Sequence, residues 1–157
     1  MPEKIGGLPA HPLIVHLPIV LGPVVGLLAL LLLFPKWRTR LLWPTAALAV
    51  VFATSAILAA ESGEQLAATL QLGEAIHEHE EAAETLRLVG FLLAIATVGV
   101  ALLGSRLKGA LQTGAIVVVA VLGLATIGFT VKTGHEGAKA VWEAPFDAAQ
   151  EAQNSGG

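Results

Sequence analysis

Cysteine and tyrosine are both absent from the 157-residue sequence, and its single methionine is Met1. The absence of cysteine excludes disulfides, iron–sulfur ligation, thiolate zinc sites and covalently attached haem. The lack of tyrosine and of any internal methionine also removes phenolate and thioether groups as metal ligands. Any metal or cofactor site must therefore be built from histidine, aspartate, glutamate or backbone atoms.

Charged residues are scarce as well. They make up 13% of the sequence against 55% hydrophobic residues, and the mean hydropathy is +0.75. Soluble domains contain roughly 25% charged residues, so this balance indicates a membrane protein in contact with the lipid bilayer. The net charge is only −3 and no Lys/Arg-rich run occurs, which argues against nucleic acid as a partner.

Four apolar segments have about the length that a helix needs to cross the hydrocarbon core. Inside a membrane, a single segment satisfies its own backbone only as a helix. We therefore expect an all-α polytopic protein whose residues 1–157 form a single domain, an antiparallel bundle of four transmembrane helices. The predicted spans are 13–34, 41–60, 88–104 and 110–131.

Basic residues predict the orientation of the bundle. The loop at 35–40 contains three of them and the loop at 105–109 contains two, and neither loop contains an acid. Both loops are therefore expected in the cytoplasm. This places both termini and the segment 61–87 on the extracytoplasmic side of a bacterial inner membrane. All twelve acidic residues and all five histidines then lie at that end of the bundle.

The segment between the second and third spans is polar but rich in helix-forming residues, and a turn is expected at Gly73. We predict that the two spans form one hairpin of long helices that extends beyond the membrane. Residues 137–157, rich in Ala, Gln and Gly toward the end, are expected to be a flexible tail with a short surface helix.

The histidines differ in how strongly they suggest a function. His16 lies within an apolar span, where an ionisable side chain is a functional hypothesis by default. For His11 and His77, a structural or surface role is the favoured interpretation, because a lone histidine near the membrane surface has a low cost. The five-residue spacing of His11 and His16 is about 140° around a helix, so the two rings are not expected to face one site.

Several short motifs resemble the DUF2231 family of bacterial four-helix membrane proteins. They are His11-Pro12-Leu13-Ile14-Val15-His16-Leu17-Pro18-Ile19, an acidic residue after the second span, His79-Glu80, and Gly134-His135-Glu136-Gly137. The resemblance extends over nearly the whole chain. It implies a site formed by His11, His16, His79 and His135 with Glu61 or Glu64. Relatives joined to Rieske iron–sulfur domains imply membrane redox work by association.

Two kinds of metal chemistry fit these residues. In the first, which the sequence favours, two imidazoles from different helices, such as His16 with His79 or His135, hold a b-type haem for electron transfer. In the second, the histidines bind non-haem iron, copper or zinc, with Glu61, Glu64 or Glu80 as ligands or as partners that orient an imidazole.

A third hypothesis is a structural or assembly subunit of a larger membrane complex, whose histidines make only hydrogen bonds. The sequence contains no phosphate-binding loop, no HExxH motif and no Ser/His/Asp order. We therefore expect a redox carrier or a subunit, which works with a redox partner or a larger complex, rather than a stand-alone enzyme.

Overall fold

The computed structural model describes residues 4–71, 76–104 and 106–155. A short antiparallel hairpin of β1 (Lys4–Ile5) and β2 (Leu8–Pro9) precedes the helices. The helices are α1 (Ala10–Ile14), α2 (His16–Leu31), α3 (Pro35–Leu70), α4 (His77–Leu103) and α5 (Gly109–Ser155).

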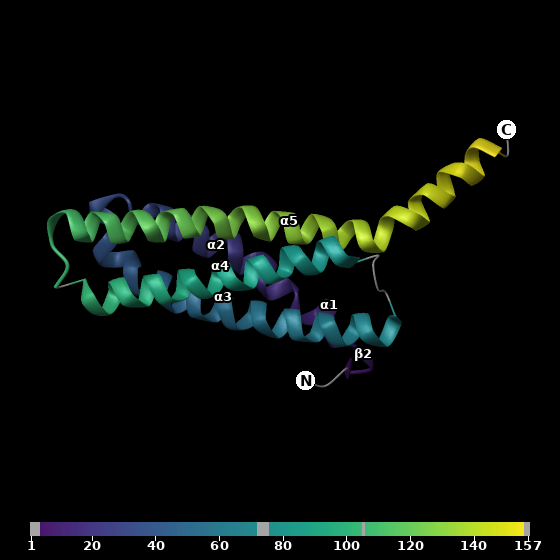
Figure 1. The fold of residues 1–157 in the computed structure, drawn as a ribbon, viewed down its shortest axis with the longest axis horizontal. Coiled ribbons are helices and arrows are strands. Elements are labelled where there is room, and N and C mark those ends of the chain that lie inside the picture. Colours follow the sequence, from purple (N-terminus) through teal and green to yellow (C-terminus); the bar gives the residue numbers. More distant parts are fainter. Residues whose placement is uncertain (1–3, 72–75, 105, 156–157) are drawn as a thin grey trace.

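The predicted all-α membrane fold is confirmed. In the described part of the chain, four helices are long and apolar enough to cross a membrane, at Ala10–Leu31, Pro35–Leu70, His77–Leu103 and Gly109–Glu143. They pack side by side as a bundle (Figure 1). Many leucine and valine side chains on the outside of the bundle are exposed, such as Leu27, Leu92 and Val121. A protein surrounded by lipid needs such a surface.

The first span begins earlier than predicted, at Ala10, and is divided at Val15. Pro18 explains the division, because proline has no N–H to donate to the carbonyl of Ile14 and so interrupts the helical bonding there. His11 is therefore inside a helix rather than ahead of one. The span ends at Leu31, where Arg38 Nε donates to the carbonyl of Leu32 over 2.8 Å.

The predicted extension of the second and third spans is also present. Helix α3 contains 36 residues, or about 54 Å at 1.5 Å per residue, whereas the hydrocarbon core is ~30 Å thick. It ends at Leu70, and the next residue, Gln71, has a φ of 55°, a left-handed conformation common at helix ends. The turn predicted at Gly73 lies outside the described residues.

Residues 137–155 belong to α5, where a flexible tail with only a short helix was expected. The helix is continuous to Ser155, and its last part points away from the bundle (Figure 1). The local sequence is rich in Ala and also contains Glu and Gln, which have high helix propensity. This propensity accounts for a helix without support from neighbouring helices.

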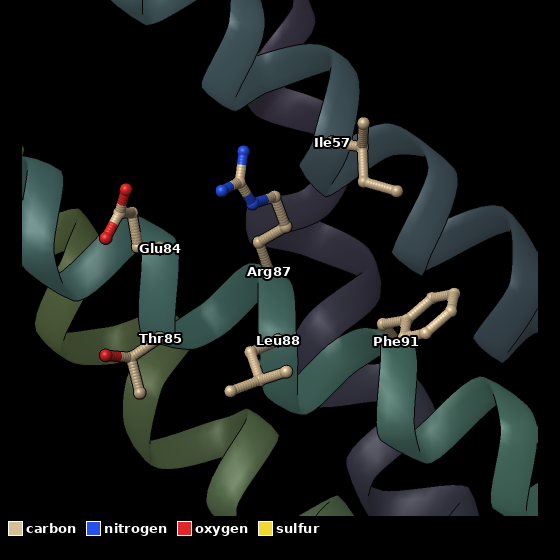
Figure 2. Close-up of a pocket in the computed structure, with 6 residues that line it drawn as sticks. All are labelled: Ile57, Glu84, Thr85, Arg87, Leu88 and Phe91. Carbon is tan, nitrogen blue, oxygen red and sulfur yellow. The ribbon is translucent and has the colours of Figure 1, made fainter.

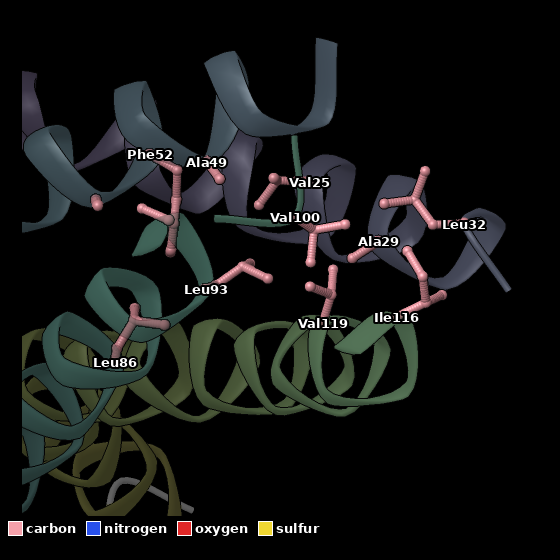
Figure 3. Close-up of a cluster of buried hydrophobic side chains, with 12 residues drawn as sticks. Val25, Ala29, Leu32, Ala49, Phe52, Leu86, Leu93, Val100, Ile116 and Val119 are labelled. Atoms are coloured by element: carbon pink, nitrogen blue, oxygen red, sulfur yellow. The ribbon is translucent and has the colours of Figure 1, made fainter. Parts of the chain in front are cut away.

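Small residues allow the helices to approach closely around a narrow core (Figure 3). Phe52, Leu93 and Val119 are fully buried at its centre. Helices α2 and α5 come so close that a Cβ atom at Gly26 would lie 2.6 Å from the carbonyl oxygen of Gly123. Small residues at helix contacts are the usual means of tight packing in membranes, where association depends on van der Waals contact.

Gly26→Ala should therefore destabilise the bundle, because backbone atoms of α5 must move to admit the new methyl group. We expect a loss of about 1–3 kcal/mol, typical of overpacking. The control is Gly128→Ala, since a Cβ atom at Gly128 meets nothing within 4 Å. Thermal unfolding in detergent, followed by circular dichroism, compares the two variants. Equal melting temperatures for both would contradict the close packing of α2 and α5.

Candidate metal centre

Two of the five histidines come together at one end of the bundle. His11 lies in the first turn of α1, and His79 lies in the first turn of α4. Their ring centroids are 6.3 Å apart and the ring planes are nearly perpendicular, at 79°. Both side chains are half-buried. The structure therefore pairs one imidazole from the first half of the chain with one from the second half.

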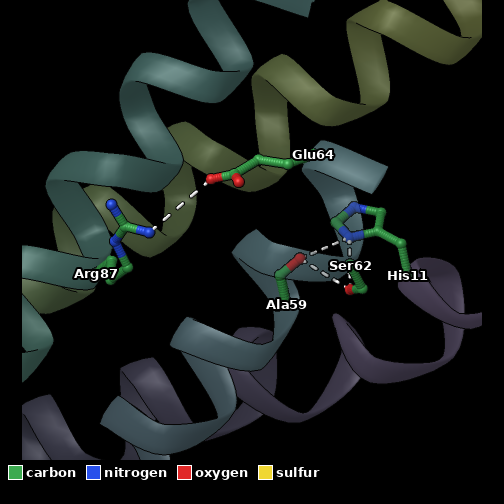
Figure 4. A network of polar contacts seen from close by, with 5 residues as sticks. All are labelled: His11, Ala59, Ser62, Glu64 and Arg87. Carbon is green, nitrogen blue, oxygen red and sulfur yellow. Dashed lines mark hydrogen bonds and ion pairs between the residues drawn. The ribbon is translucent and has the colours of Figure 1, made fainter. Parts of the chain in front are cut away.

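The ring of His11 is held by the second span. Its Nδ1–H donates to the carbonyl oxygen of Ala59 on α3 over 2.9 Å, and Ser62 Oγ lies 3.4 Å from the same nitrogen (Figure 4). Ser62 in turn donates its hydroxyl proton to Ala59 over 2.9 Å. Because a carbonyl oxygen only accepts, Nδ1 of His11 must carry the proton.

His79 is held in the same way by the fourth span. Its Nδ1–H donates to the carbonyl oxygen of Thr133 on α5 over 3.1 Å. Within the described residues, Nε2 of neither His11 nor His79 has a hydrogen-bond partner. In the neutral form, each ring therefore keeps its Nε2 lone pair free for another ligand.

A glycine one turn beyond each carbonyl makes room for the ring. A Cβ atom at Gly63 would lie 3.0 Å from Cε1 and 3.1 Å from Nδ1 of His11, and a Cβ atom at Gly137 would lie at the same two distances from the same atoms of His79. In both helices the carbonyl residue and the glycine are four positions apart. The turns Ala59–Gly63 and Thr133–Gly137 thus hold the two imidazoles in equivalent ways.

The two rings line a small, mostly apolar cleft with a volume of about 40 Å³. A buried water needs roughly 10–15 Å³ by this measure, so the cleft admits an ion with one or two waters. Larger ligands occupy pockets of about 300–1,000 Å³. The other lining residues are Val15, which joins α1 and α2, and residues of α2 to α5, namely Pro18, Ile19, Ala56, Ala59, Ala60, Ala83, Leu86, Thr130 and Thr133.

The remaining predicted histidines do not join this pair. His16 is exposed, and its Nδ1–H donates to the carbonyl oxygen of Pro12 in the preceding turn over 2.6 Å. This position agrees with the angle expected from the spacing of His11 and His16. His77 and His135 are also exposed.

The predicted acidic ligands also lie apart from the imidazole pair. Glu61 and Glu64 are exposed and Glu80 is half-buried. Glu64 lies 3.9 Å from Arg87, as an ion pair across α3 and α4 (Figure 4). Across the described ranges, no three histidine, aspartate or glutamate side chains form a group that could hold a metal ion.

A larger groove lies on the outer surface between α3 and α4. Its volume is about 610 Å³, and Ile57, Leu88 and Phe91 supply its apolar lining (Figure 2). Arg87, Glu84 and Thr85 complete it, and it contains no histidine. The groove is therefore separate from the imidazole pair.

Sequence reasoning missed the residues that hold the rings. Ala59 and Thr133 act through backbone oxygens, which every residue type has, so their side chains gave no signal. Gly63 was not singled out, while Gly137 was noted only as the end of the Gly134–Gly137 motif. The one available signal was the four-residue spacing before a glycine, and it is recognisable only once the rings have been placed.

The hydrogen bonds predict an uncommon tautomer for His11 and His79. Free neutral histidine favours a proton on Nε2, whereas these two rings should carry it on Nδ1. Long-range ¹H–¹⁵N NMR spectra of labelled protein, with His11→Gln and His79→Gln for assignment, will identify the protonated nitrogen. Detection of Nε2–H on either ring would contradict the hydrogen bond drawn for it.

Comparison with known proteins gives a family for the chain. A family model described as a predicted membrane protein (DUF2231) matches residues 7–149. No curated protein and no solved structure matches the chain. The matched region includes both paired histidines and both of the turns that hold them. The chain belongs to the DUF2231 family of predicted membrane proteins.

Proposed function

We propose that this membrane protein binds a metal ion between Nε2 of His11 and Nε2 of His79, and that the bound ion transfers electrons. The observation that carries the proposal is the equivalent placement of the two rings by Ala59–Gly63 and Thr133–Gly137. A hydrogen bond from Nδ1–H to a carbonyl oxygen is the usual way in which a metal-binding histidine is oriented.

The distance between the rings suits a shared ion. Metal–imidazole bonds are about 2.0–2.1 Å long, and two of them in line between two five-membered rings put the centroids about 6 Å apart. The observed separation is 6.3 Å. The cleft of about 40 Å³ is also of the right size for an ion.

Copper is the ion that these donors favour. Imidazole is a suitable ligand for copper, zinc, iron and nickel. Among these metals, copper combines redox activity with a singly charged state that is stable with only two ligands. The residues lining the cleft include no carboxylate. Because an uncompensated charge in an apolar site is costly, a singly charged ion is favoured over a doubly charged one.

A b-type haem is the second candidate, because the two imidazoles come from different helices of an apolar bundle, as bis-histidine haem ligation requires. The cleft is far smaller than a porphyrin, so His11 and His79 would hold haem only after α1 and α3 moved away from α4 and α5. The bare ion requires no such movement and is the stronger proposal. A structural subunit is the third candidate, with the two rings serving only to join helices.

We also propose that the paired histidines lie on the extracytoplasmic side of a bacterial inner membrane. The basic loops that support this orientation are at the opposite end of the bundle from His11 and His79. A redox partner or a larger membrane complex would then reach the metal from outside the cytoplasm.

Metal binding should depend on the paired histidines only. Purified parent protein should bind about one copper ion, while His11→Ala and His79→Ala should each weaken binding by more than about tenfold, since each removes a ligand. His16→Ala and His77→Ala are matched controls, because both rings are exposed. Metal analysis after equilibrium dialysis measures the stoichiometry and affinity.

A visible spectrum of the same samples separates the alternatives. A Soret band that is lost in His11→Ala would favour haem over a bare ion. Parent protein with neither metal nor Soret band, purified with a stoichiometric partner, would instead support the structural subunit and contradict metal binding.

Single-cysteine variants test the orientation, since the chain has no cysteine of its own. Ala68 and Thr39 are both exposed, near opposite ends of α3. A membrane-impermeant maleimide added to intact spheroplasts should label Ala68→Cys and leave Thr39→Cys unlabelled until the cells are lysed. The reverse pattern would contradict the proposed orientation.

A further inference from the structure

Thr133 has a buried hydroxyl group without a partner among the described residues. The residue is 9% exposed, and no described group forms a hydrogen bond with its Oγ1. Two other threonines on α5 behave differently. Thr126 donates to the carbonyl of Leu122 over 2.8 Å, and Thr130 donates to that of Thr126 over 2.7 Å. The bond to the carbonyl four residues back, common for threonine in a helix, is thus missing at Thr133.

The position of this hydroxyl points to a ligand rather than to a packing defect. Thr133 lines the cleft that His11 and His79 share, and its carbonyl oxygen accepts the Nδ1–H of His79. A buried hydroxyl without a partner is costly, so such groups normally bind a water or another ligand. The cleft of about 40 Å³ has room for a water-sized molecule beside an ion.

We propose that the metal at His11 and His79 carries a third, exchangeable ligand, a water or hydroxide hydrogen-bonded to Thr133 Oγ1. This inference rests on the proposed metal site. Two imidazoles are enough for Cu(I) but leave Cu(II), the other redox state of the proposed ion, short of ligands, because Cu(II) prefers four or more in a tetragonal arrangement. Besides the two imidazoles, the Thr133 hydroxyl is a polar side-chain group of the cleft that has no partner among the described residues.

One residue then has two roles at the site. The backbone of Thr133 orients the imidazole of His79, and its side chain binds the molecule that completes the coordination of the ion. A small anion that coordinates copper through nitrogen or oxygen should replace the water and accept the same hydrogen bond. Azide is a suitable probe, because its binding to Cu(II) gives a charge-transfer absorption band.

The experiment is an azide titration of the full-length, Cu(II)-loaded protein in detergent. Thr133→Val keeps the shape of the side chain and the backbone carbonyl but removes the hydroxyl. At equal copper occupancy, we expect this variant to bind azide about tenfold more weakly than the parent, the effect of losing a hydrogen bond to a charged ligand. Thr133→Ala should match Thr133→Val if the valine methyl groups are tolerated, and Thr133→Ser should bind azide like the parent.

Thr126→Val is the matched control. It removes a buried threonine hydroxyl from the same helix, but that hydroxyl is satisfied by Leu122 and lies outside the cleft. It should leave azide affinity unchanged. The proposed third ligand would be contradicted if the parent, Thr133→Val and Thr133→Ala bound azide with equal affinity. It would also be contradicted if the parent bound copper but showed no azide charge-transfer band.

Failure of the metal site itself gives a different result. Parent protein that binds no copper, or copper binding that survives the His11→Ala/His79→Ala double substitution, would contradict the proposed function and with it this inference. A different result would refute only the third ligand. In that case copper binding would require both histidines, as proposed, but the Thr133 substitutions would not change the affinity for azide.

Discussion

The arrangement of this end of the bundle depends on one interaction, the hydrogen bond from a histidine Nδ1–H to a backbone carbonyl of the neighbouring helix. Such a carbonyl already accepts a bond within its own helix and uses its second lone pair for the imidazole. The ring reaches it only where no side chain intervenes, and Gly63 and Gly137 provide that opening. The hydrogen bond thus fixes the register of α1 against α3 and of α4 against α5.

The same interaction explains how ionisable side chains are tolerated among apolar helices. When the Nδ1–H of a neutral imidazole donates to a carbonyl, the ring has no unsatisfied donor, and its Nε2 carries a lone pair without a charge. Alanine at 56, 59, 60 and 83 keeps the surroundings small and apolar. A neutral pair of donors in such surroundings is suited to an ion of low charge, whereas the exposed glutamates of α3 and α4 remain near water.

The sequence allowed prediction of the fold because membrane helices follow from local composition. The four spans and the extended hairpin needed only runs of apolar residues and the helix-forming character of 61–87. The first apolar run starts at Leu13, whereas the first helix begins at Ala10 and includes the polar His11. A flexible end was expected for 137–157 from its Ala, Gln and Gly content, whereas α5 continues to Ser155, because Ala, Glu and Gln have high helix propensity.

The candidate site was less predictable, since it depends on how neighbouring helices are rotated. Spacing within the first helix indicated that His11 and His16 would not share a site, but it did not indicate which ring faces inward. His16 was preferred because it lies deeper in an apolar run. In the structure, however, depth in the sequence does not correspond to burial, because His16 is on the outer face and His11 meets His79. Only contacts with α3 and α5 distinguish the two rings.

The two turns that hold the imidazoles are equivalent in backbone geometry but differ in their side chains. The two halves of the site are therefore not chemically equivalent. Ala59 and Thr133 occupy the same position, but only Thr133 has a hydroxyl in the cleft. At the next matching position, Ser62 lies beside His11 Nδ1, while Glu136 is bonded to Lys139 over 3.3 Å. The first half of the chain therefore uses its hydroxyl to support its own imidazole. The Thr133 hydroxyl of the second half has no partner among the described residues, so the proposed third ligand would bind beside His79.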